Sequence, residues 1–105
     1  MTRKSFQKNW SYTLFVEHPE LYLPILERDK AKSKKEAHQL DKLLRRYNVL
    51  PPSKILDYSC GIGRHTINLF RLGYEVVGYD PSPAYISLAK QWAADLLGKG
   101  NNIRF

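Results

Sequence analysis

The sequence predicts an α/β protein whose carboxyl-terminal part is one half of a doubly wound parallel sheet. From residue 54 onward, short apolar runs alternate with longer segments of helical periodicity, in the order β-α-β-α-β. Asp57 and Asp80 each follow an apolar run, so that both acids stand at the tips of predicted strands. Open α/β sheets bind nucleotide-like ligands at these tips, which makes a ligand site there the first functional expectation.

Length and composition suit one compact unit. The 105 residues are 43% hydrophobic and 26% charged, which is ordinary for a single globular domain. We expect a helical N-terminal cap over residues 1–50, which opens on a mobile basic start, and a ligand-binding half-domain over residues 51–105. No apolar run approaches the roughly 20 residues that cross a bilayer, and no signal-peptide pattern is present, so we expect a cytoplasmic protein with no membrane partner.

The formal net charge of +7 is the main compositional oddity. The positive residues concentrate between Arg28 and Arg46, and a basic balance is compatible with nucleic acid or acidic ligands. No RNP-like, zinc-finger or helix-turn-helix signature accompanies the charge. We therefore interpret these residues as a solvated helix face and treat nucleic-acid binding as the weaker alternative.

The cap is expected to contain an aromatic start and two helices. Residues 10–15 are too apolar to remain in water. Pro19 suits the first position of a helix. Pro24 is unfavourable in a helix interior, so we expect this helix to be short or kinked there. Ser33 and Glu36 fit a capping box at the start of the second helix. The apolar stripe of that helix follows at helical spacing: Ala37, Leu40, Leu43, Leu44 and Tyr47.

The half-domain is expected to contain five elements, in the order strand 54–58, helix 64–72, strand 75–79, helix 83–97 and the start of a strand at 103–105. Right-handed crossovers give the strands the spatial order 3-2-1. The first strand then lies on an open edge, and an unpaired apolar strand is a pairing hazard. We expect another copy of the chain or a partner chain to complete the sheet.

The loop after the first strand has the features of a ligand site. Gly61 and Gly63 lack β-carbons where the loop bends and a ligand would approach the backbone. The helix beginning near Arg64 points free N–H groups into the same space. Asp57 is too costly to bury alone, so it should meet loop N–H groups or a cationic ligand. Asp80 is placed to accept hydrogen bonds from ribose hydroxyls.

The glycines and acids of this loop limit the class of ligand that it can bind. A dinucleotide fingerprint requires a third glycine at Thr66, and a phosphate-binding Walker loop requires Gly-Lys-Ser/Thr; the sequence has neither. A ligand with a ribose and an amine but no phosphate fits better. S-adenosylmethionine is such a ligand.

Residues 55–93 resemble the class I S-adenosylmethionine-dependent methyltransferases, whose first motif is a hydrophobic strand, an acid and a glycine-rich loop. The similarity is close for Ile-Leu-Asp-x-x-Cys-Gly-x-Gly-Arg-His at 55–65 and continues through residues 72–80 and 82–89. The aromatic segment before residue 22 is similar to the N-terminal cap of one subgroup. The resemblance implies a Rossmann-like three-layer α/β sandwich, present here in part.

The resemblance also implies which residues bind the cofactor: Asp57, Ser59, Cys60, Gly61, Gly63, Asp80 and Pro81. Asp57, Cys60 and the two glycines would line the methionine part, Asp80 would hold the ribose, and Pro81 would lie near the adenine. Ser59 stands where the family usually has its first glycine. An aromatic residue of the cap, such as Tyr12, would close over the cofactor.

The main functional hypothesis is therefore a methyltransferase, or the cofactor-binding portion of one, acting on an unidentified acceptor. In the family a fourth strand and its following loop commonly shape the acceptor site, and this sequence contains neither, so no catalytic residue is identified. The alternatives are a non-catalytic cofactor-binding or interaction module and a basic nucleic-acid-binding accessory.

Several residues also have a purely structural interpretation. Cys60 fits a small buried residue without an activating partner, and His65 fits a helix-capping or surface residue. Tyr85 and Trp92 fit packing positions. No metal-ligand spacing links the three histidines, so no metal site is expected.

Overall fold

Two parallel strands, β1 (Lys54–Tyr58) and β2 (Glu75–Tyr79), form the sheet that positions the site. The computed structural model describes residues 9–105, so that the first eight residues of the predicted basic start lie outside it. Lys54 lies opposite Glu75 and Tyr58 opposite Tyr79. Both strands span the predicted residues, and they end at the same edge of the sheet.

The last residues of the chain lie against the other side of β2. Arg104 forms an isolated parallel bridge with Val77, and its carbonyl accepts the N–H of Gly78 at 2.9 Å. The predicted order 3-2-1 is therefore confirmed, with the third strand reduced to this one bridge.

Two helices cross between the strands on one face of the sheet, α4 (Arg64–Arg71) and α5 (Pro83–Leu97). The Oγ atom of Ser82 accepts the N–H of Tyr85 at 3.4 Å, which confirms Ser82 as the predicted N-cap. Gly73 follows α4 with φ of +103°, a left-handed conformation that glycine adopts without strain. Both helices match their predictions to within one residue.

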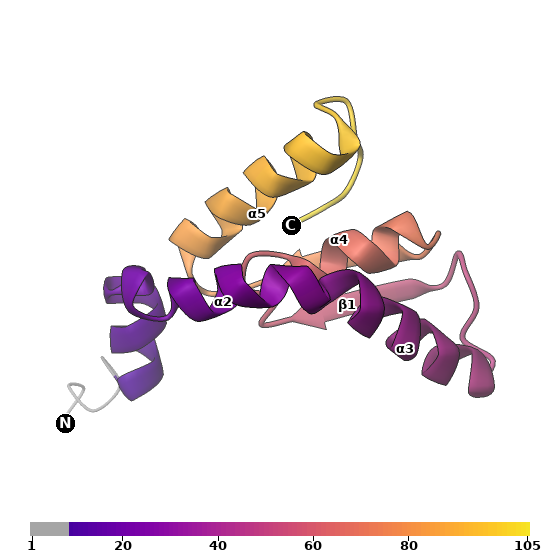
Figure 1. Ribbon diagram of the computed structural model, residues 1–105, viewed down its shortest axis with the longest axis horizontal. Helices are drawn as coiled ribbons and strands as arrows, with labels where there is room; N and C mark the ends of the chain where they lie inside the picture. Colours follow the sequence, from indigo (N-terminus) through magenta and orange to yellow (C-terminus); the bar gives the residue numbers. More distant parts are fainter. Residues whose placement is uncertain (1–8) are drawn as a thin grey trace, which may run out of the picture.

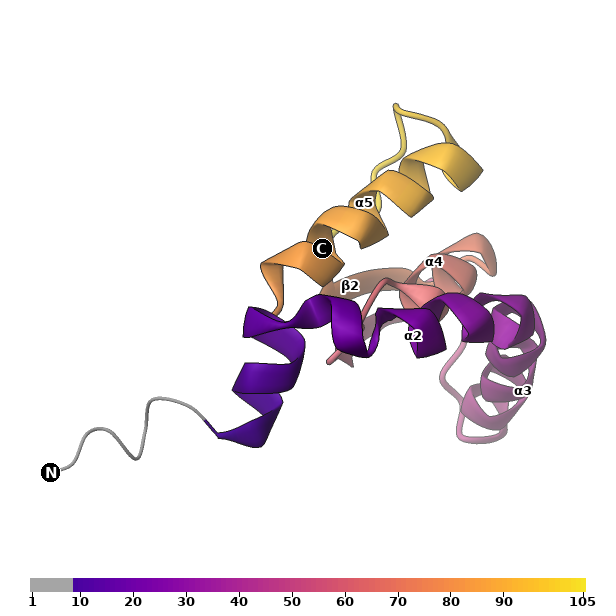
Figure 2. The ribbon, with the colours of Figure 1, turned by 60° about the vertical axis from the view of Figure 1, so that its left-hand side comes forward.

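The N-terminal cap is a chain of short helical elements: η1 (Tyr12–Glu17), η2 (Pro19–Leu21), α2 (Leu23–Asp29), η3 (Lys30–Lys32) and α3 (Ser33–Arg46). In Figure 1, α2 and α3 pass in front of β1, with α4 and α5 above them. The turned view in Figure 2 shows α5 inclined away from the other helices. The helix that begins at Pro19 is short, as predicted, because η2 ends at Leu21. Pro24 lies in the first turn of α2, where its missing N–H costs no hydrogen bond.

The capping box predicted for Ser33 and Glu36 is wrong. The backbone of Lys32 is already helical, so the donors that Ser33 would cap have carbonyl partners in the preceding turn. The Ser33 hydroxyl instead donates to the Asp29 carbonyl at 3.3 Å. Glu36 accepts a hydrogen bond from Arg64 on α4 at 2.8 Å.

The core lies between α3, α4 and the inner face of the sheet. Its buried centre is Ala37, Leu69, Tyr74 and Val76. The helices α3 and α4 cover this face. On the outer face, Leu56, Tyr58 and Tyr79 remain 64%, 69% and 48% exposed. The described residues thus form two layers of the three-layer sandwich of the class. None of their helices is long and apolar enough to cross a membrane.

Tyr74 ties β2 to α3 through its hydroxyl, which donates to Asp41 at 2.7 Å and approaches the Val49 carbonyl at 3.2 Å. The Tyr74 hydroxyl holds the pKa of Asp41 below its ordinary value. We expect Tyr74→Phe to lower the free energy of unfolding by about 1–3 kcal/mol at pH 7, the scale of a hydrogen bond to a charged group. Urea unfolding measures the loss.

The pH dependence of this loss follows from the lowered pKa of Asp41. Its stabilising effect is complete above the ordinary pKa of 3.8 and disappears as the pH falls through the lower folded value. The difference between wild type and Tyr74→Phe should therefore shrink in acid. Tyr47→Phe is the matched control, because Tyr47 is 72% exposed. Equal stability of Tyr74→Phe and wild type at pH 7 would contradict the role of this hydroxyl.

Candidate functional site

A cavity of about 510 Å³ lies where the cap meets the carboxyl ends of the two strands. Its strand side consists of residues that directly follow β1 and β2: Ser59, Gly61, Asp80 and Pro81. Its cap side consists mainly of aromatic and apolar side chains: Tyr12, Phe15, Val16, Tyr22 and Leu26. A few polar groups among apolar walls, in a volume of this size, are typical of a small-molecule site.

The carboxylate of Asp80 organises the strand side of the cavity. One oxygen accepts the N–H of Gly61 at 2.9 Å, and the other accepts the N–H of Ser82 at 2.9 Å. The tip of β2 is thereby joined to the loop after β1 and to the start of α5. Each carboxylate oxygen has a second lone pair, so Asp80 retains acceptor capacity toward the cavity.

The loop after β1 turns through left-handed conformations. Ser59 has φ of +63° and Gly61 has φ of +59°. Glycine adopts this region freely, whereas a residue with a β-carbon is strained there. The positive φ of Ser59 explains why the family usually has a glycine at this position. The N–H of Cys60 donates to the Tyr79 carbonyl at 2.9 Å, which stabilises the turn.

Asp57 lies behind this loop. Its carboxylate accepts the hydroxyl of Thr66 at 2.6 Å, and Asp57 does not line the cavity. The partner that the sequence required for this acid is therefore supplied by the first turns of α4. We expected loop N–H groups or a cationic ligand as the partner of Asp57, but the hydroxyl of Thr66 is its partner.

Gly63 serves a close packing contact. A β-carbon at this position would lie 3.1 Å from the ring of Phe105 and 3.2 Å from the β-carbon of Ala89. Gly78 is tighter still, because an added β-carbon would lie 2.8 Å from both Phe105 and Thr66. These two glycines let the final segment and α5 approach the sheet.

Cys60 is buried between the two acids of the site. Burial raises the pKa of its thiol to about 12, and the charges of Asp57 and Asp80 add to the increase. A thiol with this pKa is almost entirely protonated at neutral pH, which agrees with the structural interpretation of Cys60.

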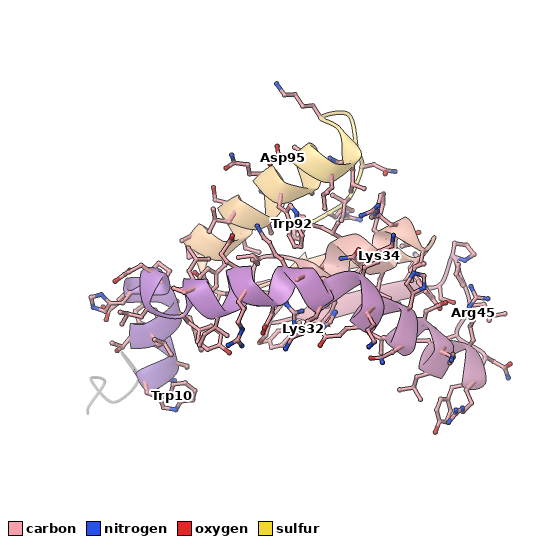
Figure 3. All side chains as sticks on the ribbon, viewed as in Figure 1. Trp10, Lys32, Lys34, Arg45, Trp92 and Asp95 are labelled. Atoms are coloured by element: carbon pink, nitrogen blue, oxygen red, sulfur yellow. The ribbon has the colours of Figure 1, made fainter. Side chains whose placement is uncertain are left out.

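The cap is fastened over the cavity by contacts distant in sequence. The hydroxyl of Tyr85 on α5 donates to the Pro19 carbonyl at 2.9 Å, and Tyr85 also lines the cavity. The ring of Phe15 packs edge-on against Tyr22, with centroids 5.4 Å apart. Trp10, by contrast, is 72% exposed and lies at the outer end of the cap (Figure 3).

Arg64 joins the cap to the helix that follows the glycine loop. Its guanidinium donates to the Asp29 carbonyl at 3.1 Å and to Glu36 at 2.8 Å, which lowers the pKa of Glu36. The ammonium of Lys30 lies 4.5 Å from the ring centroid of Trp92, which connects the cap with α5.

His65 lies outside the cavity lining. Its Nε2 atom is 4.0 Å from Glu36, and its Nδ1 atom is buried without a hydrogen-bond partner. Over residues 9–105, no three side chains of metal-ligating type lie together as a metal site would require.

The structure thus divides the seven predicted cofactor residues. Ser59, Gly61, Asp80 and Pro81 meet at the cavity, whereas the other three lie behind it in packing or hydrogen-bonding roles. Their contact with a cofactor stays a prediction. Sequence reasoning proposed Tyr12 for the cap side but missed its apolar partners. The signal for those partners was the run of aromatic residues before Pro19.

The fold is part of the Rossmann-like fold of the class I methyltransferase type. A family model described as a methyltransferase domain matches residues 55–105. A TehB-like SAM-dependent methyltransferase from Corynebacterium glutamicum has a similar structure, with a TM-score of 0.53 and 30% sequence identity. The match covers 71% of this chain and 40% of that protein. No curated protein matches the chain.

Residues 55–105 match the methyltransferase domain family, and the resemblance seen in the sequence is confirmed. The chain spans less than half the length of its structural relative. The bound cofactor, the activity and the acceptor accordingly remain matters for proposal.

The raised pKa of Cys60 predicts a chemically inert thiol. With a pKa of about 12, the reactive thiolate is about a thousandfold scarcer at pH 8 than for an ordinary cysteine with a pKa near 9. We expect alkylation by iodoacetamide to be at least a hundredfold slower in the folded protein than in urea. Mass spectrometry follows the reaction, and comparable rates in the two states would contradict the inert role.

Proposed function

We propose that this chain binds S-adenosylmethionine in the cavity and is the cofactor-binding portion of a methyltransferase. The observation that carries the proposal is the Asp80 carboxylate, held by Gly61 and Ser82 at the edge of a cavity with aromatic walls. The family match of residues 55–105 supports it. The proposal places the protein in the cytoplasm, in keeping with its composition and single cysteine.

The residues of the cavity fit the chemistry of this cofactor. The free lone pairs of Asp80 suit two adjacent ribose hydroxyls, and Pro81 and the cap aromatics offer apolar surfaces for a purine. The nearest atom to a β-carbon added at Gly61 would belong to the Leu26 side chain, at 3.6 Å. Among residues 9–105, no lysine or arginine that would favour a phosphate lines the cavity.

In this proposal, the chain contributes binding and orientation. S-adenosylmethionine, when bound, supplies a methyl group on a positively charged sulfur that an acceptor with a free electron pair can take. Asp80 orients the ribose, the loop from Ser59 to Gly61 fixes the position of the methionine part, and the cap excludes water from above. Such positioning of donor and acceptor is the main requirement of a direct displacement.

A second candidate is a non-catalytic module that binds the cofactor without transferring its methyl group. Methyl transfer to any acceptor would exclude this candidate, whereas cofactor binding alone would not.

The ribose assignment predicts the effect of removing the charge of Asp80. Asp80→Asn keeps the shape of the side chain, and we expect it to weaken S-adenosylmethionine binding by about 5- to 100-fold, corresponding to about 1–3 kcal/mol. Titration calorimetry measures the affinity. Asp95→Asn is the control, because Asp95 is an exposed acid of α5 outside the cavity (Figure 3). Unchanged affinity in Asp80→Asn would refute the ribose assignment, and no binding by folded wild type would refute the function.

The position of the cap at the cavity predicts a second effect on cofactor binding, from a substitution at Tyr12. Tyr12 lines the cavity, so Tyr12→Ala should weaken cofactor binding by about 3- to 10-fold, the scale of one aromatic contact. Trp10→Ala removes a neighbouring exposed aromatic residue and should leave the affinity within twofold. Equal affinities for the two variants would show that the cap does not contact the cofactor.

A further inference from the structure

Helix α3 carries the largest excess of positive charge of any helix that the structure describes. Its 14 residues contain five basic side chains and two acids. Residues 9–32 of the cap contain three basic residues against four acids, and residues 51–105 contain six against four. The positive charge of the described chain is therefore concentrated on this one helix.

Both acids of α3 have partners within the protein. Glu36 accepts a hydrogen bond from Arg64 at 2.8 Å. Asp41, whose side chain is only 16% exposed, accepts hydrogen bonds from Tyr74 at 2.7 Å and from Arg45 at 3.0 Å. Neither carboxylate is therefore left to neutralise the other cations of the helix.

The other cations of α3 lie on its solvent side. Lys35, Lys42 and Arg46 follow one another at intervals of seven and four residues, which places them along one line of the helix surface. All three are exposed, and none has an ion-pair partner among residues 9–105. An ordinary solvated helix carries charges of both signs in alternation, so this line of cations is a distinct feature.

Helix α4 extends the positive surface. Its last residue, Arg71, lines a hollow of about 30 Å³ beside α3, together with Lys34 and His38. Arg71 and Lys34 are exposed and lack an ion pair within the described chain. Lys34 and Arg45 come from opposite ends of α3 (Figure 3). We refer to the five unpaired cations of the two helices as the basic face: Lys34, Lys35, Lys42, Arg46 and Arg71.

An exposed aromatic ring at the end of α3 distinguishes between possible polyanions. Tyr47 directly follows Arg46 and is 72% exposed. Cations beside an exposed aromatic ring are the arrangement with which proteins hold the phosphates of a single strand and stack its unpaired bases. A membrane surface would instead require an apolar side of the helix that is free to insert. The apolar side of α3 packs into the core through Ala37, Leu40 and Leu44.

We propose that the basic face and Tyr47 bind single-stranded nucleic acid, with the cations on its phosphates and the tyrosine ring on a base. Lys35 and Arg46 lie about 16 Å apart along the helix axis, the length of about five phosphates in a stacked strand. No residue of the basic face lines the cavity, so the inference does not rest on the proposed cofactor.

The test is a fluorescence anisotropy titration of labelled single-stranded DNA with the full chain. DNA offers the same phosphates and base faces as RNA, and a strand of about 12 nucleotides exceeds the expected footprint. Five phosphate contacts should make the affinity fall about 100-fold between about 50 and 200 mM salt. Absence of binding at the lower salt concentration would overturn the proposal.

Two double variants locate the binding surface. Lys35→Glu with Lys42→Glu should weaken binding at least about tenfold at low salt, because two phosphate contacts become repulsions. Lys90→Glu with Lys99→Glu is the matched control, since it changes the net charge equally at exposed lysines outside the basic face. This control should stay within about threefold of wild type. Equal losses in the two double variants would refute the assignment to α3. Unchanged circular dichroism shows that the variants fold.

The role of Tyr47 is tested separately. Tyr47→Ala should weaken binding about fivefold or more, the scale of one stacked base. Tyr58→Ala is the control, because Tyr58 is 69% exposed but lies on the sheet; it should leave the affinity within about twofold. Equal affinities of these two variants, or tighter binding of a duplex of the same length, would refute the single strand as ligand. Binding of phosphatidylserine vesicles without binding of the oligonucleotide would assign the face to a membrane and overturn the proposal.

Discussion

The site depends on one carboxylate that joins three segments of the chain. Asp80 ends β2, accepts the N–H of Gly61 in the loop after β1, and accepts the N–H of Ser82 at the start of α5. The parallel pairing makes this possible, since it brings the ends of β1 and β2 to the same edge. Without this acceptor, the Gly61 N–H would lose its partner in a buried loop.

The cap is integrated with this arrangement at several points. Arg64 begins the helix after the glycine loop and binds the carbonyl of Asp29 and the side chain of Glu36. Tyr85 binds the Pro19 carbonyl from α5. The wall of the cavity is therefore built from segments that precede and follow the strands in sequence, and a change in the cap is expected to reach the cofactor site through these contacts.

The two faces of the sheet differ in burial. The inner face carries the core and supports the loop through Asp57, Thr66 and Gly63. The outer face has an apolar surface of the kind that parallel sheets normally bury. An uncovered second face is consistent with the match to part of a longer relative.

The sequence alone determined the strands, the helices after residue 54 and their order in the sheet. These features follow from local periodicity and from glycine, proline and serine at turns, which act over a few residues. Only the tertiary structure decided which side chains reach the cavity, because those contacts join residues such as Pro19 and Tyr85 that lie far apart in the chain. In the tertiary structure, Glu36 pairs with Arg64 and does not form the predicted capping box, and Asp57 lies behind the loop. No local sequence pattern predicts either outcome, since each depends on which residue of another segment packs against Glu36 or Asp57.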